Sequence, residues 1–174
     1  MRIANWFCSA ILLLLCLGAG AQDKRNPSTP EERKRFVAVT RDVIRAPLDT
    51  SRQSDVRWAL QWLSDVPDVV VDPCPAPLED LTTSGNRYSP KIFGIYVLAM
   101  GAYAIEHSGS VNDPAGQFQA GIEAALKAYQ AILKVDPGAT SDDLDDLLAK
   151  QRTGKLQEFV QQASGACKGQ NESS

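Results

Sequence analysis

Apolar residues recur at three- and four-residue spacing along most of this chain, which is the spacing of one face of an α-helix. The longest stripe predicts a helix from about Ala115 to Val135. It is formed by Phe118, Ile122, Leu126, Tyr129 and Leu133. Shorter stripes of the same kind predict a helix over residues 29–46, one that begins near Ser51–Ser54 and runs to about Ser64, and two more on either side of Gly154. The pattern therefore indicates a helical protein.

Capping and breaking residues mark where these helices begin and end. Ser28 or Thr29 can cap the first helix, and Pro30 suits its first turn because an N–H group there has no partner in the helix. By the same signals, Ser89 is expected to cap a helix that starts at Pro90, and Thr140 or Ser141 to cap a later one. These signals agree with the apolar stripes.

The segment between Lys91 and Glu106 carries no charged residue. A helix that is apolar all round is either buried or inside a membrane, and this one is shorter than the roughly 20 residues that a membrane span needs. We therefore expect the central helix of the core here. Gly94 and Gly101 lie nearly on one of its faces, which would let a neighbouring helix approach closely.

Residues 67–77 break the helical pattern. Three valines, Val69 to Val71, precede prolines at 73, 75 and 77, and both features favour extended backbone. The predicted fold class is therefore all-α, a bundle of five or six helices with one extended proline-rich segment strapped across them and one disulfide.

The first 21 residues are typical of a secretory signal peptide. Arg2 precedes an apolar run with five aliphatic residues at its centre, and small residues then end at Ala21. A membrane anchor is the alternative, but the run is too short to cross a bilayer. Leu15 occupies the position before Cys16 where a lipoprotein would have a small residue. We expect cleavage after Ala21 and an exported protein, periplasmic or secreted, that does not span the membrane.

The remaining chain divides by composition into three parts. Residues 22–28 are expected to form a flexible linker, residues 29–167 one helical domain, and residues 168–174 a disordered tail. Removal of residues 1–21 changes the formal net charge from −3 to −4. This mild acidity, without a basic stripe, argues against binding to nucleic acid.

Cysteine usage predicts one disulfide. Cys8 and Cys16 leave with the signal peptide, so Cys74 and Cys167 remain in an oxidising compartment, where two cysteines most simply form a bridge. Two buried free thiols are the alternative. Metal binding is disfavoured because no histidine or further cysteine lies near either residue at ligand spacing.

One helix resembles a known repeat. Residues 125–137 are similar to the second helix of a tetratricopeptide repeat, which places alanine, an aromatic residue and proline where Ala125, Tyr129 and Pro137 stand. The match departs at Ile132, where that family prefers a small residue, and no second copy follows. The resemblance implies a helical hairpin and a groove for a protein partner; an ordinary amphipathic helix is the alternative.

Candidates for chemistry are few, and we expect neither a cofactor nor a metal site. His107, the only histidine, is interpreted as structural at the end of the central helix. For an enzyme whose groups converge only in the fold, Glu106, His107 and Asp113 are the best candidates. The acidic run Asp142 to Asp146 lacks the glycine and the spacing of a calcium-binding loop, so it is interpreted as a solvated helix start.

Three functions remain open at this point. The leading hypothesis is a non-enzymatic module that binds another envelope or secreted protein. The alternatives are a small carrier of an apolar ligand and a hydrolase-like enzyme. A cavity beside Gly94 and Gly101 would favour the carrier, whereas tight packing there would argue against it.

Overall fold

A computed structural model describes residues 25–73, 78, 86–107 and 113–171, with side chains as far as residue 164. Within these ranges the regular elements are helices and no strand occurs, which confirms the all-α class. Their bounds are α1 Pro30–Arg45, the 3₁₀ turn η1 Thr50–Arg52, α2 Gln53–Asp65, α4 Ser89–Glu106, α5 Pro114–Leu133, α6 Asp142–Arg152 and α7 Leu156–Asn171.

Side-chain caps begin most of these helices. Thr29 accepts a hydrogen bond from the Glu32 amide, and the Glu32 carboxylate accepts one from the Thr29 amide, so α1 begins with a capping box. Asp113 caps α5 and Ser141 caps α6. Of the two residues expected to cap the first helix, Thr29 does so and Ser28 does not. Of the two expected to cap α6, Ser141 does so and Thr140 does not.

The start of α4 differs from the expectation. Ser89 is the first helical residue and does not act as its cap; the preceding residue, Tyr88, makes no side-chain capping bond. The reason is a local turn at Asn86, whose side-chain oxygen accepts from the Tyr88 amide at 2.9 Å while its carbonyl accepts from the Ser89 amide at 3.0 Å. This turn starts the helix one residue early.

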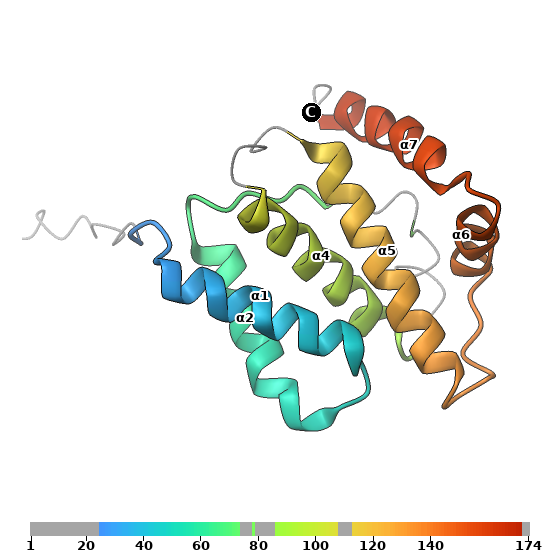
Figure 1. Ribbon diagram of the computed structural model, residues 1–174, viewed down its shortest axis with the longest axis horizontal. Helices are drawn as coiled ribbons and strands as arrows, with labels where there is room; N and C mark the ends of the chain where they lie inside the picture. Colours follow the sequence, from blue (N-terminus) through green and yellow to red (C-terminus); the bar gives the residue numbers. More distant parts are fainter. Residues whose placement is uncertain (1–24, 74–77, 79–85, 108–112, 172–174) are drawn as a thin grey trace, which may run out of the picture.

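The helices pack around the antiparallel pair α4 and α5. Figure 1 shows α1 and α2 on one side of this pair and α6 and α7 on the other. Two apolar clusters fill the spaces. One joins α4 and α5 to α6 and α7, and the other joins α4 to α1, α2 and two alanines of α5. As expected, α4 is the central core helix, with both clusters drawing on it.

The chain after α2 is a strap over the second cluster. Val66 and Val69 are buried in it, and Val71 packs against both clusters. Asp68 fixes the strap to the start of α1, because its carboxylate accepts from the Ser28 amide at 2.8 Å and from Arg33 at 2.7 Å. Residues 66–73 are not helical, and residues 67–68 form a turn; residues 74–77 of the predicted proline-rich segment lie outside the described parts of the chain.

Two sequence-based expectations fall outside the described parts of the chain. Cys74 and the side chain of Cys167 are not among the described residues, so their disulfide stays a prediction. The same holds for the signal peptide. Among the helices that the structure describes, none combines the length and the apolar character that a bilayer crossing requires.

Candidate functional site

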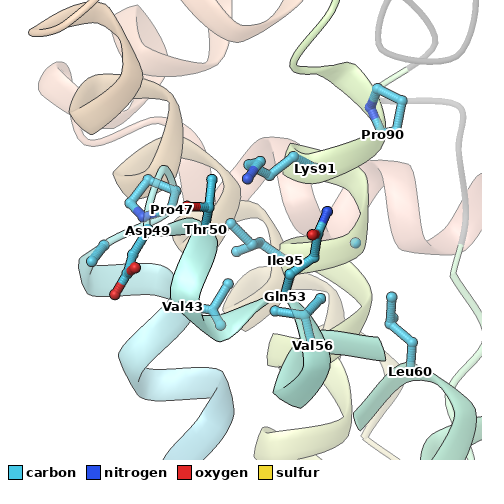
Figure 2. A pocket seen from close by; sticks show the side chains of 12 residues that line it. Val43, Pro47, Asp49, Thr50, Gln53, Val56, Leu60, Pro90, Lys91 and Ile95 are labelled. Atoms are coloured by element: carbon cyan, nitrogen blue, oxygen red, sulfur yellow. The ribbon is translucent and has the colours of Figure 1, made fainter. Parts of the chain in front are cut away.

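A partly enclosed cavity of about 250 Å³ lies where the end of α1, the turn η1, α2 and the first turns of α4 meet. Figure 2 shows these segments surrounding it. Most of its wall is apolar. The lining residues are Val43, Ala46, Pro47, Asp49, Thr50, Gln53, Val56, Leu60, Pro90, Lys91, Gly94 and Ile95.

Gly94 keeps this space empty. A Cβ atom at Gly94 would have one neighbour within 4 Å, the Leu60 Cδ1 atom at 3.9 Å. Any larger residue here would therefore send its side chain towards the cavity, between α4 and α2. The sequence marks Gly94 as a point of close helix approach, but the structure shows unfilled space beside it.

Gly101, at the other end of the same helix face, has the opposite surroundings. A Cβ atom there would lie 3.0 Å from both Leu63 Cδ1 and Phe36 Cζ. This end of the glycine stripe is packed tightly, as the sequence predicts. The stripe is therefore divided into a closed contact around Gly101 and a cavity beside Gly94.

Polar groups gather at the cavity mouth. Thr50, Gln53 and Lys91 are exposed there, and Figure 2 shows the Lys91 side chain extending towards the loop that carries Thr50. The Lys91 ammonium group makes no hydrogen bond or ion pair with any residue in the described ranges. It is a cation beside an apolar space, and none of the described residues pairs with it.

Asp49 also lines the cavity, but its carboxylate already accepts hydrogen bonds from another residue of the protein. Its carboxylate accepts from the Ser51 hydroxyl at 2.7 Å and from the Ser51 amide at 2.9 Å. These two bonds, with the nearby charge of Arg52, lower the pKa of Asp49. Figure 2 shows this carboxylate turned away from Lys91.

The three residues considered for catalysis each have a structural partner. Glu106 forms an ion pair with Arg41. His107 stacks on Tyr103, with ring centroids 4.0 Å apart, and its Nδ1 atom lies 3.0 Å from the Tyr103 carbonyl oxygen. Asp113 caps α5 by accepting from the Gly116 amide at 2.9 Å.

Asp113 also binds Tyr103, whose hydroxyl donates to its second oxygen at 2.9 Å. The bond from the Gly116 amide, followed by that from Tyr103, lowers the pKa of Asp113. A shallow hollow of about 190 Å³ between α1, α4 and α5 reaches Glu106, but neither His107 nor Asp113 lines it. Among the described residues, this hollow does not bring Glu106, His107 and Asp113 together.

The acidic run at the start of α6 has the expected helix-start position. Asp142, Asp143 and Asp145 lie in the first turn, where acids complement the helix dipole. Asp145 accepts from the Tyr129 hydroxyl at 3.0 Å, and Asp146 pairs with Lys150. Among the residues searched, which are the described ones, no cluster of potential metal ligands occurs.

Two of the three residues that carry the resemblance to a tetratricopeptide repeat, Ala125 and Tyr129, are core residues of α5, whereas Pro137 follows the helix and is exposed. Ala125, Tyr129 and Ile132 are all fully buried, so their side chains face the neighbouring helices. The helix forms a hairpin with α4, as the resemblance implies. The departure at Ile132 is accommodated because this side chain fills the core shared with α6 and α7.

Comparisons of the chain with models of protein families, with curated proteins and with solved structures found no match. Its function is therefore inferred from its own residues.

Proposed function

We propose that this protein is a non-catalytic binding protein that holds a small apolar molecule in the cavity between α1, α2 and α4. One observation carries the proposal: about 250 Å³ of largely apolar space stays unfilled beside Gly94. Protein interiors are otherwise close-packed, with few voids larger than a water molecule. A partly open apolar cavity with a few polar groups at its mouth is the usual form of a ligand site.

The size of the cavity sets the size of the ligand. An engineered cavity of about 150 Å³ holds benzene, which has six carbon atoms. Scaled by volume, a cavity of 250 Å³ takes roughly ten carbon-sized groups. A substituted ring or a medium-length acyl chain meets this limit, whereas a long-chain lipid exceeds it.

The chemistry at the site supports binding without turnover. General acid–base catalysis needs a titrating group within hydrogen-bond reach of the substrate. The cavity is lined by one carboxylate, Asp49, which is bound to Ser51 and turned outward. His107 stacks on Tyr103 at the far end of α4.

Isothermal titration with a series of straight-chain alkan-1-ols tests the proposal. Each methylene group that enters the cavity contributes about 0.8 kcal/mol, so affinity should rise about fourfold for each added carbon. The rise should stop at roughly ten carbons, when the cavity is full. A flat series, or a rise that continues well past this length, would argue against this cavity as the site.

Two variants that fill the cavity from opposite walls provide the control. Gly94→Leu places a side chain in it from α4, and Val56→Phe enlarges one from α2. Both should keep the helical circular dichroism spectrum and lose alcohol binding. Retained binding in two folded variants would move the site elsewhere.

Binding to a protein, the leading hypothesis from the sequence, is the second candidate. Val70 is 66% exposed on the strap, at the edge of a shallow groove that Leu60, Leu63 and Val97 also line. Export would place either function in the periplasm or outside the cell. Native mass spectrometry of the protein purified from its own host separates the two, because a carrier retains a small mass and a binding module retains a polypeptide.

A further inference from the structure

We infer that the ligand is a monoanion, an apolar body that ends in a carboxylate or a comparable acidic group. This inference rests on the proposed function and adds the chemistry of the head group. The body occupies the apolar cavity, and the acidic group remains at the mouth beside Lys91.

The unpaired Lys91 is the main observation. Two arginines in or near the turn η1, Arg45 and Arg52, both have a carboxylate partner, Asp42. Lys91 has none within the described residues, although it lines the mouth of the cavity. A neutral ligand would leave this cation as it is, whereas an acid would give it a partner.

The helix that carries Lys91 adds to the positive potential. Lys91 lies in the first turn of α4, where the helix dipole is positive. The N-cap residue, Tyr88, supplies no side-chain acceptor, and the first turn contains no acidic residue. An anion at the mouth would therefore interact favourably with both the ammonium group and the helix end.

The remaining groups at the mouth are compatible with an acidic head. Thr50 and Gln53 are exposed there and bring a hydroxyl and an amide, both of which can donate hydrogen bonds to a carboxylate. Asp49 is the one opposing charge in the lining. The Asp49 carboxylate faces away from Lys91 and accepts hydrogen bonds from Ser51. The polar groups at the mouth of the cavity are therefore hydrogen-bond donors.

Three probes of equal chain length test this inference: octanoate, octan-1-ol and octylammonium. Each is titrated calorimetrically into the full mature protein and into Lys91→Gln at low ionic strength. The variant should bind octanoate about fivefold more weakly, bind octan-1-ol unchanged and bind octylammonium more tightly. High salt should reduce the difference for octanoate because Lys91 is exposed.

Lys34→Gln is the matched control. It removes the same charge from an exposed position on α1 that does not line the cavity. It should leave all three affinities unchanged, so a loss in both variants would reflect net charge and overturn the local role of Lys91.

The outcomes separate the inference from the proposed function. Binding of octan-1-ol with no dependence of octanoate on Lys91 would overturn the acidic head group and leave an apolar carrier. Absence of binding by all three probes would overturn the proposed function, and the inference with it. Tighter binding of octylammonium than of octanoate by the unmodified protein would reverse the sign of the inferred ligand.

Discussion

The Cβ position of Gly94 lies 3.9 Å from Leu60 Cδ1, and apart from its two chain neighbours and the backbone of α4 no other atom of the described residues lies within 4 Å. Helices α4 and α2 therefore contact each other here without filling the space between them. At Gly101, two turns further along, the same face of α4 is packed against Phe36 and Leu63. One helix face thus combines a closed contact at Gly101 with an unfilled cavity at Gly94.

Gly94→Ala should stabilise the protein. The added methyl group meets ordinary van der Waals contact, and alanine favours a helix interior by about 0.5–1 kcal/mol over glycine. Chemical denaturation should therefore show a higher midpoint in urea with an unchanged slope.

Gly121→Ala is the matched control for this substitution, because its surroundings are filled. A Cβ atom at Gly121 would lie 2.6 Å from Tyr96 Cδ2, and Tyr96 is fully buried. Overpacking of this kind costs about 1–3 kcal/mol, which exceeds the gain in helix propensity. Equal effects of the two substitutions would contradict the difference in packing between the two sites.

Asp113→Asn should change how stability depends on pH. The hydrogen bonds from the Gly116 amide and Tyr103 lower the pKa of Asp113 in the folded state. A lowered folded pKa contributes stability above the unfolded value of about 3.9, and this contribution is lost as the pH falls through the folded value. Asparagine still caps the helix but carries no charge.

The unmodified protein should therefore be more stable than Asp113→Asn by up to about 1 kcal/mol near neutral pH. The difference should shrink as the pH falls below about 3.9 and disappear below the lowered folded pKa of Asp113. Urea denaturation at a series of pH values measures it. A difference that is constant over this range, or that grows on acidification, would show that the charge of Asp113 does not stabilise the fold.

Tyr129→Phe should destabilise the junction of α5 and α6. The Tyr129 hydroxyl accepts from the Ser141 amide at 3.0 Å and donates to Asp145 at 3.0 Å. Its loss removes both hydrogen bonds from the junction, one of them to a carboxylate, and each such bond contributes about 0.5–1.5 kcal/mol or more. Tyr88→Phe, which removes an exposed bond from Arg87, should cost less than about 0.5 kcal/mol. Similar losses of stability in both variants would exclude this explanation.

The predicted Cys74–Cys167 bridge has a direct signature in the mass of the oxidised chain of residues 22–174, which should be two hydrogen atoms below the mass of its reduced form. Cys74→Ala should lower the melting temperature of the oxidised protein, because a loop of about 90 residues is no longer closed. An unchanged melt together with two titratable thiols in the unmodified protein would mean that no bridge forms.

Much of the helical framework could be predicted from the sequence, because the signals are local. The stripe from Phe118 to Leu133 predicts α5 closely, and the uncharged run up to Ile105 identifies the central core helix. The cap at Ser89 was mispredicted because the turn at Asn86 competes with it. Caps depend on such neighbours as well as on the residue itself.

The cavity could not be predicted in the same way. Its wall joins Val43, Gln53, Leu60 and Gly94, which are far apart in the chain and meet only after packing. A glycine on a buried helix face is compatible with close contact between helices or with empty space between them. Close contact is found at Gly101, and empty space is found at Gly94. The role inferred for Lys91 could not be predicted from the sequence, because exposed lysines are common and only the folded structure shows that an apolar cavity lies beside this one.

The most direct test of the central claim is methyl NMR spectroscopy of residues 22–174 during titration with octan-1-ol, which is neutral, so that its binding does not depend on Lys91. The account predicts saturable shifts at the methyl groups of Val43, Leu60 and Ile95, which line the cavity. Ile122 and Leu126, in the other apolar cluster, should not move. Absence of saturable shifts at the cavity, or shifts centred on Ile122 and Leu126, would contradict the claim that this protein binds an apolar ligand beside Gly94.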